Sequence, residues 1–314
     1  MNHPIVASLV PVVLLIAIGF LAGKRAWIGA GAVRDLSNMV FLLLAPALLF
    51  RTMAAQAHAL QFGPVVVYFG AAVVLYAGML AVLGFNTRGA VLALAGTFSN
   101  TVMIGTPLVS LAYGDAALVT HFALVALHAL VLLTMATIVL ELASAREALA
   151  RGETGGRHMA ATVGLAVKNA VIHPVPLPIL CGLAFAQTGL ALPAVVDKPL
   201  QLLGQAFAPL ALVLVGVTLA ANPVGQQLKG ALGLTLAKNL IHPALMAMAG
   251  WAFGLQGLAL VVMVVAASLP IGANVFLFSQ RYRVAEELVT ATVAVSTLAG
   301  LFTIPLVMWL AGHL

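Results

Sequence analysis

The sequence predicts an all-α membrane protein in which ten transmembrane helices form two inverted five-helix repeats. Three observations lead to this prediction. Of the 314 residues, 63% are hydrophobic and only 7% are charged, whereas a soluble domain is about 45–50% apolar and about a quarter charged. Apolar stretches of bilayer-spanning length recur along the chain. Proline and glycine landmarks also recur at one fixed offset. Little polar sequence remains for a separate soluble catalytic domain.

Ten apolar segments follow one another, separated by glycine, proline or charged residues. About 20 apolar residues are enough to cross the hydrocarbon core. The first segment is expected to be retained and not cleaved as a signal, because nothing basic precedes its apolar run and Lys24 and Arg25 follow it. The predicted spans are residues 5–23, 36–54, 63–84, 89–112, 116–141, 163–187, 195–220, 230–252, 257–279 and 288–311.

One long polar connection divides the predicted spans into two sets of five. It covers residues 143–162 and is rich in charge, including Arg146, Glu147 and Arg151. We therefore expect a first five-helix repeat at 1–142, a cytoplasmic linker at 143–162 and a second five-helix repeat at 163–314.

The basic residues give the expected orientation. Loops on the cytoplasmic side of a membrane carry an excess of Lys and Arg. If the N-terminus lies outside, only Arg51 and Lys198 fall in outer loops. Both termini are therefore predicted on the outer side of the cell inner membrane. The inner loops then hold Lys24, Arg25, Arg34, Arg88, Arg146, Arg151, Arg157, Lys168, Lys229, Arg281 and Arg283.

The two halves share landmarks at an offset of 163 residues. Because each half has an odd number of spans, the second half enters the membrane from the opposite side. Inverted repeats are typical of transporters that work by alternating access, although channels and membrane enzymes also contain duplications. The matching pairs are Pro11 with Pro174, Gly19 with Gly182, Pro46 with Pro209, and Pro107 with Pro270.

The fourth and ninth predicted spans are expected to be broken helices. Proline removes a backbone donor and glycine lets the chain open. Freed backbone groups at membrane depth are costly unless they line a cavity or bind a ligand, and a half-helix N-terminus favours an anion. The alternative is a pair of proline kinks with locally bonded asparagines. The residues concerned are Asn100, Thr101, Gly105 and Pro107 in the fourth span, and Pro270, Gly272 and Asn274 in the ninth.

Ionisable residues are scarce within the predicted spans. All eight acids fall in loops or at span ends, which argues against a sodium–proton antiporter driven by a buried acid. Lys238 and His242 share a helix face and are candidates for charge attraction or proton coupling. The alternative is that Lys238 snorkels to the interface and His242 bonds a neighbour. His121 and His128 fit satisfied interior histidines better than a metal site. No metal or cofactor is expected.

The two broken segments resemble motifs of a known family. The run from Asn100 to Leu108 and the run from Leu269 to Tyr282 are similar to the fourth-span and ninth-span motifs of the auxin efflux carrier family. Lys238, His242 and Pro243 resemble its eighth span. The resemblance covers essentially the whole chain. It is nearest to the bacterial malonate-transporter-like branch, because the long central loop of the plant members is missing.

This resemblance implies a homodimer of ten-helix protomers. Helices 1, 2, 6 and 7 would form a scaffold, and helices 3–5 and 8–10 a mobile transport domain whose fourth and ninth helices cross at their prolines. The substrate carboxylate would lie at that crossing, near Asn100. The bile-acid symporters share this architecture and bind sodium, but the acids that such cation sites often use are absent here.

The function expected from the sequence is secondary transport of a small organic anion, a malonate-like carboxylate or an auxin-like acid, by alternating access. The alternatives are a sodium-coupled symporter of the bile-acid type and a passive anion channel. An enzyme is not expected, because the spans lack paired acids. Expected partners are the lipid bilayer and a second copy of the chain, and no nucleic acid, because no basic patch interleaved with aromatic residues is present. The expected substrate-binding residues are Asn100, Thr101, Gly105, Pro107, Pro270, Gly272 and Asn274.

Overall fold

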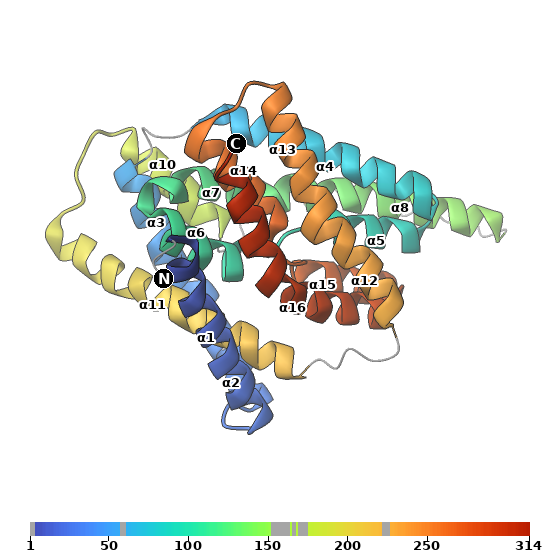
Figure 1. The fold of residues 1–314 in the computed structure, drawn as a ribbon, viewed down its shortest axis with the longest axis horizontal. Helices are drawn as coiled ribbons and strands as arrows, with labels where there is room; N and C mark the ends of the chain where they lie inside the picture. The colour runs from blue at the N-terminus through green and yellow to red at the C-terminus, as the bar shows by residue number, and fades with distance from the viewer. Residues whose placement is uncertain (1–3, 57–60, 152–163, 165–167, 169–174, 222–226) are drawn as a thin grey trace.

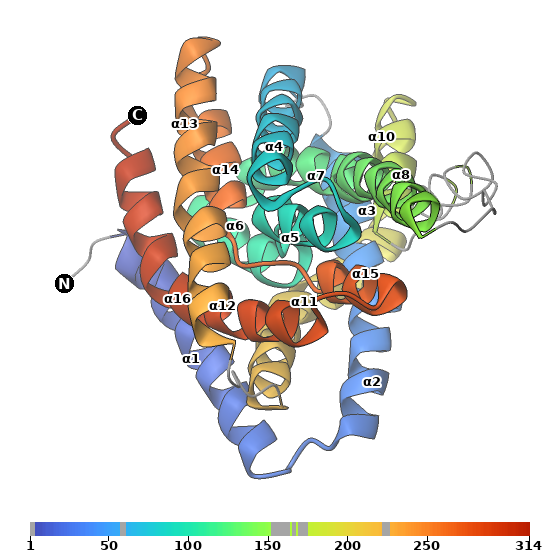
Figure 2. The ribbon, with the colours of Figure 1, turned by 90° about the vertical axis from the view of Figure 1, so that its right-hand side faces the viewer.

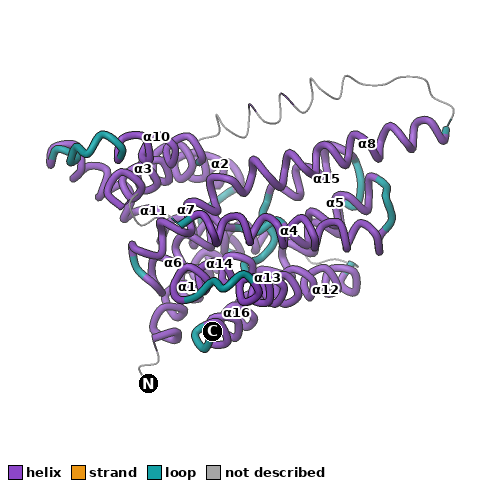
Figure 3. The backbone as a smooth tube through the Cα atoms, turned by 90° about the horizontal axis from the view of Figure 1, so that it is seen from above, coloured by secondary structure: helices purple, strands orange, loops and turns teal. Residues whose placement is uncertain are grey.

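The structure is a computed structural model that describes residues 4–56, 61–151, 164, 168, 175–221 and 227–314. Over these residues the elements are helices joined by short loops, as Figures 1 and 3 show, and the β-structure is an isolated bridge. The first half contains α1 (Pro4–Lys24), α2 (Ala30–Met39), η1 (Val40–Leu44), α3 (Ala45–Gln56), α4 (Phe62–Leu83), α5 (Thr87–Thr97), η3 (Thr101–Gly105), α6 (Thr106–Tyr113), α7 (Asp115–His128), η4 (Ala129–Leu133) and α8 (Thr134–Ala150). The second half contains α10 (Pro176–Ala186), α11 (Ala194–Ala221), α12 (Leu228–Leu236), η5 (Ala237–Ile241), α13 (His242–Ala252), α14 (Gly257–Ser268), α15 (Asn274–Tyr282) and α16 (Glu286–Ala311).

The all-α prediction is confirmed for the described residues. Among these residues, five helices are long and apolar enough to cross a membrane, and shorter apolar helices accompany them. Two predicted spans, 89–112 and 257–279, are each divided into two helices by a short non-helical segment. The arrangement of ten spans as an inverted repeat stays a prediction.

Part of the predicted linker at 143–162 is helical. Helix α8 continues to Ala150, so residues 143–150 are helical. Most of the remaining linker, at 152–162, lies outside the described residues. So does much of the start of the predicted sixth span, including the landmark Pro174.

Helix α1 lies along α11 at unusually close range (Figure 1). A Cβ atom added at Gly19 would overlap the backbone carbonyl of Val213, and one added at Gly216 would overlap that of Ile16. The two glycines therefore permit the approach of these helices, as small residues do at membrane helix contacts.

The helices pack in two groups that share an apolar core. Helix α11 contacts α1 and α3, and α3 also contacts α10, while α4 and α5 pack against each other and against helices of the second half, including α12, α13 and α15 (Figure 2). Buried apolar residues join the two groups, among them Leu9 on α1, Leu108 on α6, Leu212 on α11 and Val265 on α14. This packing surrounds the two broken helices with other elements.

Candidate binding site at the crossing of two broken helices

The two breaks meet at one point in the fold. Helix α5 ends at Thr97 and α14 ends at Ser268. The segments that follow pair as an antiparallel bridge between Ser99 and Ile271. The Asn100 N–H donates to the Pro270 carbonyl at 2.8 Å, and the Gly272 N–H donates to the Phe98 carbonyl at 3.0 Å. Each break thus satisfies backbone groups of the other, as membrane depth requires.

Pro107 does not lie at the break that the sequence assigned to it. The fourth span opens at residues 98–100, and Pro107 follows in the first turn of α6. The π-helical turn η3 runs directly into α6, so Pro107 lies inside a continuous helix from Thr101 to Tyr113. Its missing amide follows a turn in which the regular hydrogen-bond pattern is already displaced. Pro270, by contrast, stands within the extended segment of the ninth span.

Two histidines of α7 hold the first broken segment, and they require opposite ring tautomers. The Ser99 N–H donates to His128 Nε2 at 3.0 Å, so this nitrogen must be unprotonated. His121 Nε2 lies 2.9 Å from the Thr101 carbonyl, which only accepts, so this nitrogen must carry its proton. Both rings are buried. They are interior histidines that fix the backbone at the crossing, but they are only partly satisfied, because the buried Nδ1 of each has no hydrogen-bond partner among the described residues.

Lys238 holds the second broken segment. Its Nζ donates to the carbonyls of Ala267 at 2.5 Å and Leu269 at 2.7 Å, which end α14. The side chain is completely buried, so the alternative that it snorkels to the interface is wrong. His242 is also completely buried, with its ring centroid 5.8 Å from that of Tyr68. Neither residue lines a cavity beside the crossing.

A cavity of about 520 Å³ lies on one side of the crossing. This volume falls within the range of about 300–1,000 Å³ typical of small-molecule sites. Its described lining contains no Asp, Glu, Lys or Arg. The polar lining residues come from α2, α7, α11 and both broken segments, and they are Ser37, Asn38, Ser99, Asn100, Thr101, His128, Thr218 and Asn274.

The crossing offers hydrogen-bond donors to this cavity. The Asn100 side-chain oxygen accepts from the Met103 N–H at 3.3 Å, which leaves the amide NH₂ as a donor. Helical turns begin at Thr101 and at Asn274, both in the cavity lining. Because a helix start carries partial positive charge, this arrangement favours an anion without any charged side chain.

A second cavity, of about 340 Å³, lies at the far end of the same broken helix. Thr106 and Pro107 line it, five and six residues beyond Thr101, together with residues of α3 and α11. Arg51 in this lining forms a bidentate ion pair with Asp197, at 2.6 Å and 3.1 Å. No residue of the paired segments at 98–101 and 269–272 belongs to the lining of this second cavity.

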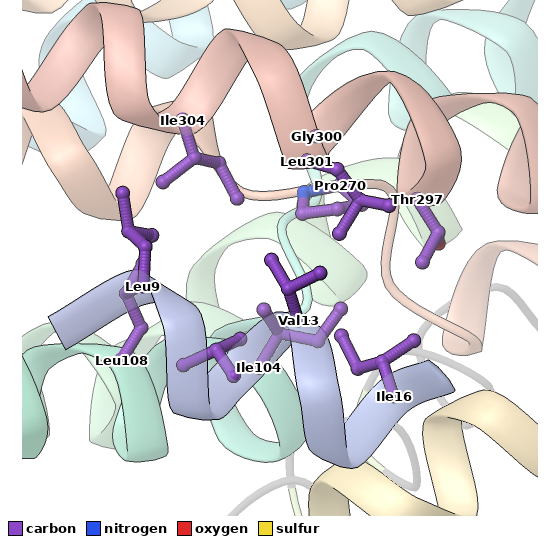
Figure 4. Close-up of a pocket in the computed structure, with 11 residues that line it drawn as sticks. Leu9, Val13, Ile16, Ile104, Leu108, Pro270, Thr297, Gly300, Leu301 and Ile304 are labelled. Carbon is purple, nitrogen blue, oxygen red and sulfur yellow. The ribbon is translucent and has the colours of Figure 1, made fainter. Parts of the chain in front are cut away.

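The back of the crossing is apolar and nearly filled. Figure 4 shows Pro270 next to Gly300 and Leu301 of α16, with Thr297 of the same helix to one side and Val13 of α1 and Ile104 of η3 below. The space between them is about 20 Å³, room for about one water molecule. Pro270 thus packs against helices and does not face the large cavity.

Only some of the predicted binding residues line the large cavity. Asn100, Thr101, Gly272 and Asn274 line the 520 Å³ cavity. A Cβ at Gly105 would overlap Leu269 and His121, so this glycine serves close packing. Sequence reasoning missed Ser37, Asn38 and Thr218, which lie on other helices and carry no local motif.

We expect His128→Leu to lower transport and stability, because the buried Ser99 N–H loses its acceptor at a cost of about 1–3 kcal/mol. His128→Gln keeps an acceptor at similar reach and should restore most of both. Thermal unfolding and solute flux of the purified variants measure this, with the exposed His313→Leu as control. Equal behaviour of the Leu and Gln variants would contradict the acceptor role.

The sequence is similar to those of known membrane transport proteins. A family model described as "Membrane transport protein" matches residues 4–308. A protein named "Putative malonate transporter" from Rhizobium meliloti is 28% identical over 310 residues, which cover 94% of this chain and 92% of that protein. The transporter YfdV of Escherichia coli strain K12, itself uncharacterized, is 24% identical over 309 residues, 96% of each chain. Auxin efflux carrier component 8 of Arabidopsis thaliana is 25% identical over 241 residues, 65% of this chain and 66% of that protein.

Proposed function

The chain belongs to the membrane transport protein family, which includes the auxin efflux carriers, and from this premise we propose that it carries a small organic anion across the inner membrane by alternating access. It is a multi-pass membrane protein of a transporter family. Both termini would lie on the outer side, as the distribution of Lys and Arg predicts.

The observation that carries the proposal is the lining of the 520 Å³ cavity. Three asparagines (Asn38, Asn100 and Asn274) and two helix starts line it, and no charged side chain does so among the described residues. A carboxylate entering this cavity would receive hydrogen bonds from the Asn100 amide and from the helix start at Asn274. The name of the Rhizobium meliloti relative makes malonate the first substrate to test.

The two cavities support alternating access. One lies at Thr101 and the other at Thr106, so a modest displacement of the broken helices would exchange access between them. The two packing groups of helices support a scaffold of α1–α3, α10 and α11, and a moving domain of α4–α8 and α12–α16. In this proposal the halves are inverted repeats and the scaffold also forms a homodimer.

The contacts of Lys238 are evidence for transport that does not require sodium. Its Nζ already donates to the two carbonyls that end α14. Carbonyl oxygens freed by a broken helix are the ligands that membrane transporters offer to sodium. Since these two are bonded to a lysine, we propose that they are closed to a coupling ion.

The test is transport of labelled malonate into vesicles that contain the purified protein. We expect saturable uptake that accumulates malonate against its gradient when a proton gradient is imposed, with equal rates in sodium and in potassium buffers. Flux that never saturates would identify a passive anion channel. An absolute need for sodium would identify a symporter of the bile-acid type.

A further inference from the structure

A third cavity, remote from the crossing, has the form of a lipid site. It is an apolar groove of about 460 Å³ between α4, α5, α12 and the start of α16. Its walls are leucine, valine, methionine, alanine and glycine, and one charged side chain, Arg88, lines it. Val82, one of the lining residues, is 86% exposed, so the groove opens onto the outside of the helix bundle.

Two glycines help to make the groove. A Cβ atom added at Gly78 on α4 or at Gly233 on α12 would meet nothing within 4 Å. Side chains at these positions would project into open space that the helices themselves do not fill. Apolar volume of this kind is occupied by whatever apolar solvent surrounds it, and here that solvent is lipid.

The groove is basic at one end and apolar along the rest of its length, as a phospholipid has a charged headgroup and apolar acyl chains. Arg88 lies in the first turn of α5, next to the end of α4 at Val82 and Leu83. On α4, Leu75 lies seven residues before Val82, and on the other wall Ala237 lies seven residues after Gly230. Each is therefore about 10 Å further from the Arg88 end of the groove. Lys229 lies one helical turn before Gly233 and is exposed. The basic end belongs to the predicted cytoplasmic interface and the apolar end to the membrane interior.

The positive charge at this end is available to a ligand. Arg88 forms no ion pair with any residue that the structure describes. The nearby carboxylate of Glu147 accepts from the Thr87 N–H at 2.7 Å and from the Thr87 hydroxyl. Glu286 and Glu287, at the start of α16, do not line the groove.

We infer that this groove binds one anionic phospholipid of the inner leaflet, with an acyl chain between α4 and α12 and the phosphate at Arg88 and Lys229. Binding of the acyl chain depends on the apolar volume of the groove, and the preference for an anionic headgroup depends on the basic residues. One substitution can therefore test the volume and another the charge. Basic residues near a membrane surface each contribute about fivefold in affinity for anionic lipid.

The experiment is native mass spectrometry of the full-length protein in detergent. Phosphatidylglycerol or phosphatidylcholine with the same acyl chains is added as the probe. We expect the wild type to retain one phosphatidylglycerol more tightly than phosphatidylcholine. Arg88→Gln should weaken phosphatidylglycerol about fivefold and leave phosphatidylcholine unchanged. Gly78→Leu should weaken both lipids because the new side chain fills the groove.

Matched controls exist on the same protein. Gly70→Leu places the same side chain on α4 in equally open space outside the groove, and Arg34→Gln removes one charge from the same predicted face. Both should bind lipid as the wild type does. Equal lipid binding by Gly78→Leu and the wild type, or no preference for phosphatidylglycerol, would overturn the inference. So would a change of oligomeric mass in Gly78→Leu, because the groove would then be an interface between copies.

Discussion

Replacing Asn100 with aspartate is expected to abolish most transport while leaving the fold intact. Asp keeps the side-chain oxygen that accepts from the Met103 N–H and remains a good N-cap. It exchanges the NH₂ donor for negative charge in a cavity that has no charged side chain in its described lining. Loss of a hydrogen bond to a charged group, worth about 1.5–3 kcal/mol, together with repulsion, predicts a drop in kcat/KM for malonate of about 100-fold or more.

The matched control is Asn86→Asp. Asn86 also caps a helix, accepting from the Gly89 N–H at 2.7 Å, but it lies away from the crossing. Its variant should transport at the wild-type rate. Thermal unfolding of both variants should stay near that of the wild type. Unchanged flux in a well-folded Asn100→Asp protein would remove Asn100 from the site.

The sequence located this site because a break in a membrane helix leaves a local mark. Asn100 lies seven residues before Pro107 and Asn274 four residues after Pro270, each in a segment that also contains glycine, and the structure brings both to one cavity. The same signal misplaced the break at Pro107, because a proline that follows a π-helical turn inside a helix and a proline at a break look alike in sequence. The two cases can be distinguished only from the backbone conformation in the structure.

Other parts of the site depend on contacts between distant residues. Lys238 bonds carbonyls 29 and 31 residues away, and the Ile271 N–H donates to Ser296 Oγ, 25 residues away. The π-helical turn η5 contains Lys238 and Asn239, and both are completely buried. If the eighth span is treated as a regular α-helix, the spacing of Lys238 and His242 predicts only that they share a helix face. It gives no information on the carbonyl groups that Lys238 contacts.

Lys238→Met is expected to destabilise the protein more than any other single change considered for the crossing. Methionine fits the space of the lysine stem but donates no hydrogen bond, so two buried carbonyls at the end of α14 lose their donor. Each unsatisfied group costs about 1–3 kcal/mol, which predicts a loss of about 2–6 kcal/mol and a melting temperature lower by several degrees. Transport should fall as well, since Leu269 and Pro270 set the position of the paired segments.

The control for this variant is Lys198→Met, at an exposed position where Nζ bonds the neighbouring Gln201. Its unfolding and flux should match the wild type. If Lys238 acted instead by attracting the substrate, Lys238→Met would raise KM at unchanged stability, and that outcome would contradict the structural role. A protein that melts early but retains the wild-type KM in its folded fraction would agree with it. The position of Lys238 behind the paired segments, outside the cavity lining, favours the second result.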